Sequence, residues 1–127
     1  MTVTMEECYQ ALDGNYAEAS TRFPNSRLIE KFIGKFLEDP SFETLCAQMK
    51  AGNRPEAFRC AHTLKGVCAN LGFSRLLKSA GQLTDELRTE TETIPDTAFS
   101  LLEDVRHDYQ ITVDAICRYL DMVKQEV

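Results

Sequence analysis

The chain has 127 residues, a formal net charge of −6 at pH 7, a hydrophobic fraction of 43% and a charged fraction of 27%. This length fits one domain, and the composition is that of an ordinary soluble globular protein. The acidic balance argues against nucleic acid or an anionic membrane as the main partner, and the short apolar runs cannot span a bilayer.

Apolar residues recur at helical spacing from one end of the sequence to the other, without a sustained strand-like alternation. We predict short N-terminal helices within residues 4–23. The first is capped by Thr4 together with Glu7 and closed by Gly14, and the second stops at Pro24.

An apolar face continues over about residues 26–51, which we predict to be helical with an interruption at Asp39 and Pro40. The interruption follows from the proline, because proline disfavours helical geometry in the residue before it. Asn53 then offers a helix cap, and the next helix is predicted over residues 54–71, with a glycine in the C-terminal capping position.

Two further helices are predicted over about residues 74–89 and 95–124. Each carries a continuous apolar seam, and the seams consist of Leu76, Ala80, Leu83 and Leu87 in one and of Leu102, Val105, Tyr109, Val113, Ile116, Leu120 and Val123 in the other. Short connections favour antiparallel neighbours. The predicted fold is therefore all-α, a single domain over residues 1–127 built as an antiparallel four-helix bundle with short additional N-terminal helices.

Cysteine and histidine are too scattered to predict a metal site. The five cysteines form no closely spaced pair; they are Cys8, Cys46, Cys60, Cys68 and Cys117. We expect most of them to be small buried side chains in a reducing cytoplasm. A zinc site needs cysteine and histidine at close spacing, and the two histidines are His62 and His107. We therefore expect no bound metal, no secretion leader and a cytoplasmic location.

The helix predicted over residues 54–71 carries an unusual combination of histidine, lysine and glycine within five positions. Its core stripe is formed by Ala57, Ala61, Leu64, Cys68 and Leu71. At about 100° per residue, His62 lies about 150° from the middle of this stripe, so we predict that it faces solvent. The glycine is costly, because glycine inside a helix destabilises it by about 1 kcal/mol relative to alanine.

The surroundings of His62 are bare on one side, because Gly66 has no side chain and Ala69 has only a methyl group. Lys65 lies three residues after the histidine and can reach back to the same point of the helix surface. An open, neutral imidazole beside a cation meets the needs of a phosphoryl acceptor. A histidine and a lysine at this spacing are equally typical of a solvated helix face, so the residues by themselves leave both interpretations open.

The string HTLKG at residues 62–66, followed after four residues by Leu-Gly, resembles the H-x-L-K-G-x4-L-G signature of histidine-containing phosphotransfer (HPt) domains. Flanking segments within about residues 10–90 also resemble bacterial members. The resemblance implies a four-helix bundle that accepts a phosphoryl group from a receiver-domain aspartate and passes it to another response regulator. His62 is then the phosphoacceptor, Lys65 stabilises the charge of the phosphoryl group, and Gly66 provides steric clearance.

The resemblance also implies the partners, which are response regulator receiver domains and a hybrid sensor histidine kinase. We expect no cofactor in this chain, Mg²⁺ in the partner's receiver domain only, and a monomer. The residues expected to dock partners are Phe58, Arg59, Ala69 and Thr84. Many members place Gln or Glu at the position of Thr84 to hold the imidazole by a hydrogen bond, and the shorter threonine departs from that pattern. Gln82 is expected to point elsewhere.

Two other functions stay open at this point. The bundle could bind receiver domains or act as a scaffold without accepting phosphate, and the departure at Thr84 is the argument for it. A hydrolytic enzyme with His62 as general base would need a pocket and a second catalytic group, which a bare helix face does not offer. The sequence has no glycine-rich phosphate loop, so we expect no kinase activity of its own. His107 stands among acidic residues and is assigned no role.

Overall fold

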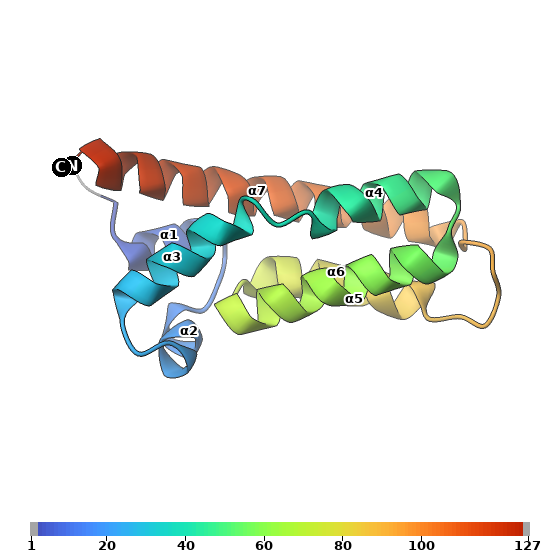
Figure 1. The fold of residues 1–127 in the computed structure, drawn as a ribbon, viewed down its shortest axis with the longest axis horizontal. Helices are drawn as coiled ribbons and strands as arrows, with labels where there is room; N and C mark the ends of the chain where they lie inside the picture. Colours follow the sequence, from blue (N-terminus) through green and yellow to red (C-terminus); the bar gives the residue numbers. More distant parts are fainter. Residues whose placement is uncertain (1–2, 126–127) are drawn as a thin grey trace.

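The computed structural model describes residues 3–125, and these residues form helices and no strands (Figure 1). The helices are α1 (Met5–Ala11), α2 (Tyr16–Arg22), α3 (Ser26–Phe36), α4 (Ser41–Ala51), α5 (Arg54–Leu71), α6 (Ser74–Leu87) and α7 (Thr97–Gln125). The all-α prediction is confirmed. The predicted ends differ slightly from the observed ones, since α6 stops before residue 89 and α7 starts after residue 95.

Side-chain caps explain where several helices begin. The Thr4 hydroxyl accepts a hydrogen bond from the Glu7 amide at 3.1 Å, and the Glu7 carboxylate accepts one from the Thr4 amide at 3.2 Å. This reciprocal pair satisfies two amides at the start of α1 that have no partner within the helix. Asn15, Asn25 and Asn53 cap α2, α3 and α5 through their side-chain oxygens.

The break between α3 and α4 lies where the sequence predicts it, around Pro40. The Asp39 carboxylate accepts a hydrogen bond from the Ser41 amide at 2.8 Å, which supports the first turn of α4. Figure 1 shows α3 and α4 following one another along the length of α7. The two short helices thus take the place of one long helix of the bundle.

The core is formed by the apolar faces of α4, α5, α6 and α7 and extends to buried side chains of α1 and α3. The largest fully buried side chains are Tyr9, Leu12, Ile29, Ile33, Leu45, Met49, Leu64, Phe73, Leu76, Leu83, Leu87 and Ile116. Burying each such side chain contributes roughly 1.5–3 kcal/mol to folding, before the cost of ordering the chain. None of the helices within residues 3–125 is both long and apolar enough to cross a bilayer.

The N-terminal segment is bonded to the corner where α5 ends and α6 begins. The bonds run from Tyr9 Oη to the Leu71 carbonyl (2.6 Å), from the Asn15 amide to the Gly72 carbonyl (2.7 Å) and from the Arg75 amide to the Asp13 carbonyl (3.2 Å). Gly72 has φ of 72°, and a Cβ there would lie 2.6 Å from the Asn15 carbonyl oxygen. Only glycine fits this close approach and this left-handed geometry.

Candidate functional site

The position of α5 follows from its cap and its apolar stripe. The Asn53 side chain accepts a hydrogen bond from the Glu56 amide at 3.3 Å, and Pro55 occupies the first turn. The buried side chains of the helix are Ala57, Cys60, Ala61, Leu64, Cys68 and Leu71. Their burial turns the opposite face of α5 outward, and His62 is exposed there as predicted.

The helix surface next to His62 is open. Gly66 lies one turn after the histidine and is exposed, and a Cβ built on it meets no atom within 4 Å. No contact within the described fold therefore requires a glycine at this position. Gly66 costs α5 about 1 kcal/mol of helix stability. Since the fold does not need a glycine here, we interpret the open space above it as space for a binding partner.

Lys65 extends from the histidine side of α5 toward α6. Its Cε lies 3.8 Å from where a Cβ on Gly81 of α6 would be, so the aliphatic part of the lysine packs over this second glycine. Lys65 is half-buried, and no ion pair joins it to a carboxylate within the described part of the chain. Its charge is thus available to an anion that approaches the histidine face.

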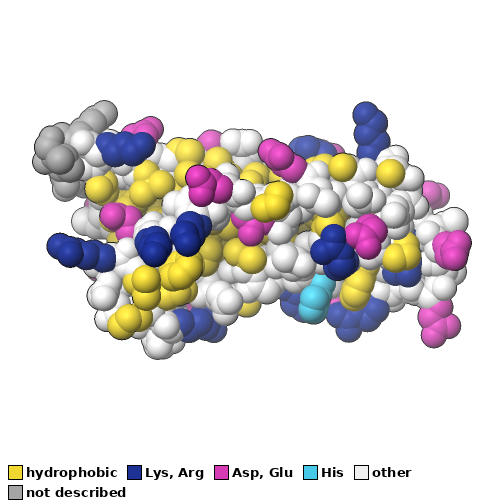
Figure 2. Space-filling model, in the orientation of Figure 1, with side chains coloured by type: hydrophobic (Ala, Val, Ile, Leu, Met, Phe, Trp, Pro, Cys, Tyr) yellow, Lys and Arg dark blue, Asp and Glu magenta, His cyan; other side chains and the backbone are white. Residues whose placement is uncertain are grey.

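An aromatic ring flanks the imidazole on the other side. The Phe58 ring lies nearly parallel to the His62 ring, with centroids 6.0 Å apart and an angle of 15° between the planes. The guanidinium carbon of Arg88, just after α6, lies 5.6 Å from the Phe58 centroid. Arg59 is exposed and pairs with Glu56 at 2.9 Å. Figure 2 shows a histidine over α5 with basic and hydrophobic side chains next to it.

The domain that carries this helix face matches a known protein family. The family model described as "Hpt domain" matches residues 27–124, which is more than half of the chain. The protein belongs to the Hpt domain family. Members of this family are histidine phosphotransfer modules of phosphorelays. No curated protein and no solved structure matches the chain.

The match places α4–α6 and most of α3 and α7 inside the Hpt domain, together with His62, Lys65 and Gly66. It begins within α3, so α1 and α2 lie outside the matched residues. The bonds from the N-terminal segment to the corner between α5 and α6 are therefore a feature of this Hpt domain that the family match does not cover.

Thr84 does not lie on the surface of this Hpt domain, and the prediction that it docks a partner is wrong. The contacts of Phe58 with Arg88 and of Lys65 with Gly81 show the register of the antiparallel helices α5 and α6. This register places position 84 opposite His62. However, Thr84 is fully buried, and its hydroxyl donates a hydrogen bond to the Ala80 carbonyl at 2.7 Å. A partner cannot reach this side chain.

The other predicted docking residues are accessible. Phe58 and Ala69 are half-buried and Arg59 is exposed, and all three lie on the same helix as the histidine. The sequence analysis missed two residues near the site. Gly81 of α6 lies next to Lys65, and Arg88, directly after α6, lies next to Phe58. The short turn between α5 and α6 could have predicted them, because residues equally far from a tight turn lie at the same level of two antiparallel helices.

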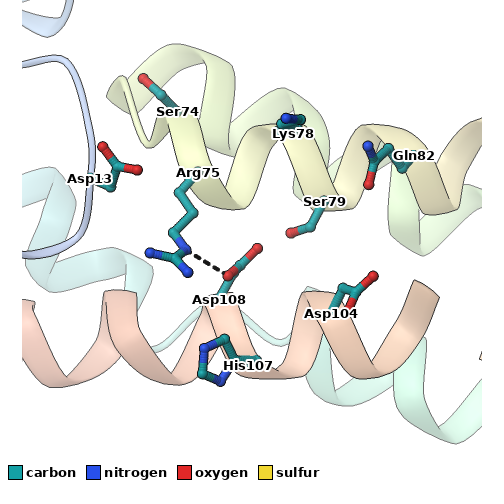
Figure 3. A pocket seen from close by; sticks show the side chains of 9 residues that line it. All are labelled: Asp13, Ser74, Arg75, Lys78, Ser79, Gln82, Asp104, His107 and Asp108. Atoms are coloured by element: carbon teal, nitrogen blue, oxygen red, sulfur yellow. Dashed lines mark hydrogen bonds and ion pairs between the residues drawn. The ribbon is translucent and has the colours of Figure 1, made fainter. Parts of the chain in front are cut away.

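The second histidine of this Hpt domain belongs to a different part of the surface. His107 lines an open groove of about 580 Å³ between α6 and α7, together with acidic and basic side chains (Figure 3). Arg75 and Asp108 form an ion pair in this groove, with Nε and Oδ1 2.8 Å apart. Gln82 lines the same groove and therefore points away from His62, as predicted. Within residues 3–125, no group of three potential ligands is placed to hold a metal ion.

Proposed function

We propose that this Hpt domain is a phosphorelay intermediate. His62 accepts a phosphoryl group from the phosphorylated aspartate of a receiver domain and passes it to the aspartate of another response regulator. The observation that carries the proposal is the open helix surface at Gly66, beside an exposed histidine. A receiver-domain active site has to come close to the imidazole, and a side chain at position 66 would stand in its way.

The transfer step needs only groups that this face and a receiver domain contain. A ring nitrogen of His62 attacks the phosphorus of the aspartyl phosphate, so an N–P bond forms as the bond between phosphorus and the aspartate oxygen breaks. The electron pair of the broken bond stays on the aspartate as a carboxylate, and the ring proton exchanges with solvent. Lys65 stabilises the negative charge of the moving phosphoryl group. The partner supplies Mg²⁺, and this chain needs no cofactor for the step.

The partner docks on the face of α5 that carries His62. Phe58, Arg59 and Ala69 surround the histidine along this helix and are the proposed contacts. A relay protein has to release each partner after transfer, so we expect a small interface at the lower end of the size range of specific complexes. The donor is the receiver domain of a hybrid sensor histidine kinase, and the acceptor is a separate response regulator.

A second function, receiver binding without phosphorylation, is favoured by one observation. Within residues 3–125, no hydrogen bond holds the imidazole of His62, and the hydroxyl of Thr84 is directed to the Ala80 carbonyl. A member that had lost its phosphotransfer chemistry could keep the docking face and lose the group that orients the histidine.

Phosphate transfer from a receiver domain separates the two functions. The protein is incubated with a receiver domain labelled on its aspartate, and acid-labile, alkali-stable phosphate is measured on the Hpt domain. His62→Gln is the test variant, and His107→Gln on α7 is the matched control. We expect label on the native protein and on the control but none on His62→Gln. Binding of several receivers without any label would favour the second function.

A further inference from the structure

The imidazole of His62 needs a side chain that restricts its rotation, and the described hydrogen bonds provide none. Position 84 lies opposite His62 in register, but Thr84 is buried and its hydroxyl is bonded to its own helix. A freely rotating imidazole presents its nitrogen to a phosphoryl group only part of the time, and small misplacements of a nucleophile slow a reaction strongly. A neighbouring side chain therefore has to limit the orientations of this ring by packing.

We propose that Phe58 is the positioning residue of His62, an inference that rests on the proposed function of His62 as phosphoacceptor. Side chains on a helix lean toward its N-terminus, so the imidazole of His62 leans over the turn that carries Phe58. The two rings are nearly parallel there, and their separation of 6.0 Å is within the range of attractive aromatic pairs. The Phe58 ring forms a flat wall on the N-terminal side of the imidazole.

The same lean explains why the opposite side of the imidazole is open. A side chain at position 66 would lean back over His62, and Gly66 has none. The imidazole thus has an aromatic wall on one side and free space on the other. This arrangement restricts the ring while leaving the phosphoryl group a path of approach.

Phe58 is itself held from the neighbouring helix. The guanidinium group of Arg88 lies over the Phe58 ring, 5.6 Å from its centroid, which is within the range of a cation–π interaction. Next to this contact, a hydrogen bond of 2.9 Å from Arg54 to the Leu87 carbonyl joins the start of α5 to the end of α6. Arg88 therefore limits the rotamers of Phe58, and Phe58 in turn limits those of His62.

The test separates positioning from docking by using two phosphoryl donors. Phosphoramidate is a small donor that needs no protein interface; its P–N bond breaks and ammonia leaves as the bond to histidine forms. A phosphorylated receiver domain is the second donor. The variants are Phe58→Leu, which removes the aromatic ring, and Phe58→Tyr, which restores it. Phe99→Leu on α7 is the matched control, since Phe99 is 45% exposed and lies on another helix.

We expect Phe58→Leu to slow phosphorylation by about 2- to 10-fold with both donors, and Phe58→Tyr to restore the native rates. The couplings between the α and β protons of His62, measured by NMR, report its rotamers directly. They should be unequal in the native protein and in Phe58→Tyr, and move toward averaged values in Phe58→Leu. Unchanged couplings, or a loss of rate with the receiver domain alone, would overturn the positioning role in favour of docking.

The two proposals fail in different ways. If neither donor labels the native protein while Phe58→Leu still averages the His62 couplings, the phosphorelay function is wrong and the positioning stands. If the native protein is labelled and Phe58→Leu changes neither the couplings nor the phosphoramidate rate, the phosphorelay function stands and the positioning is wrong.

Discussion

Replacing Gly66 with alanine is expected to stabilise the fold and to slow phosphotransfer at the same time. A Cβ at this position meets no atom within 4 Å, so the methyl group causes no clash within the described fold. The substitution removes the helix penalty of glycine, which amounts to about 0.5–1 kcal/mol. For a chain of 127 residues, such a gain corresponds to a rise in Tm of about 2–4 °C.

The loss of transfer should grow with the size of the side chain at position 66. Because helical side chains lean toward the N-terminus, a residue there approaches the imidazole of His62 and the space of the incoming phosphoryl group. We expect a moderate effect for Gly66→Ala and a loss on the order of 100-fold for Gly66→Leu, through misplacement of the reacting groups. Thermal unfolding and transfer from a labelled receiver domain are measured on the same samples.

Gly52 provides the matched control for this experiment. A Cβ on Gly52 also meets no atom within 4 Å, but its φ is +73°, whereas Gly66 is in the interior of α5. Gly52→Ala should therefore destabilise the fold by about 1 kcal/mol and leave transfer unchanged. Our explanation of Gly66 is refuted if Gly66→Ala lowers Tm, or if Gly66→Leu is folded and transfers phosphate at the native rate.

Three further predictions test the cation, the N-terminal bonds and a buried thiol. Lys65→Gln should reduce the transfer rate while circular dichroism shows an unchanged fold, and an unchanged rate would remove Lys65 from the proposed step. Tyr9→Phe should lower the free energy of unfolding in urea by about 1–2 kcal/mol, because the buried Leu71 carbonyl loses its partner; a change near zero would contradict this. Burial raises the pKa of Cys8 from 9.0 to about 11. The folded state therefore holds the proton more tightly, and stability should fall as the pH rises from 9.0 to about 11. Urea unfolding across this range should show a smaller decrease for Cys8→Ala, and an equal decrease would assign the effect to other groups.

Helical periodicity was sufficient to predict the face on which His62 lies. The apolar stripe of α5 fixes its orientation in the bundle, and the exposure of His62 follows from that geometry alone. The breaks and caps were also predictable, because Pro40 and Asn53 act through local geometry and local hydrogen bonds. These features depend on residues close together in the sequence.

The features that could not be predicted depend on contacts between helices. That position 84 lies opposite His62 depends on the register of α5 and α6, whereas the burial of its threonine was within reach of periodicity, because Ala80 and Leu87 lie one turn before and after it. The contact of Arg88 with Phe58 likewise needs the register of two helices to within one residue.

The bonds from the N-terminal segment to the end of α5 bear on how this domain can be moved between proteins. A chimaera designed on the matched residues 27–124 would leave out the partners of the Leu71 and Gly72 carbonyls. The histidine helix would then end without two of its contacts, and both carbonyls lie at the corner that sets the direction of α6. A transplanted phosphotransfer module that keeps its native register should therefore start before α1, well upstream of the family boundary.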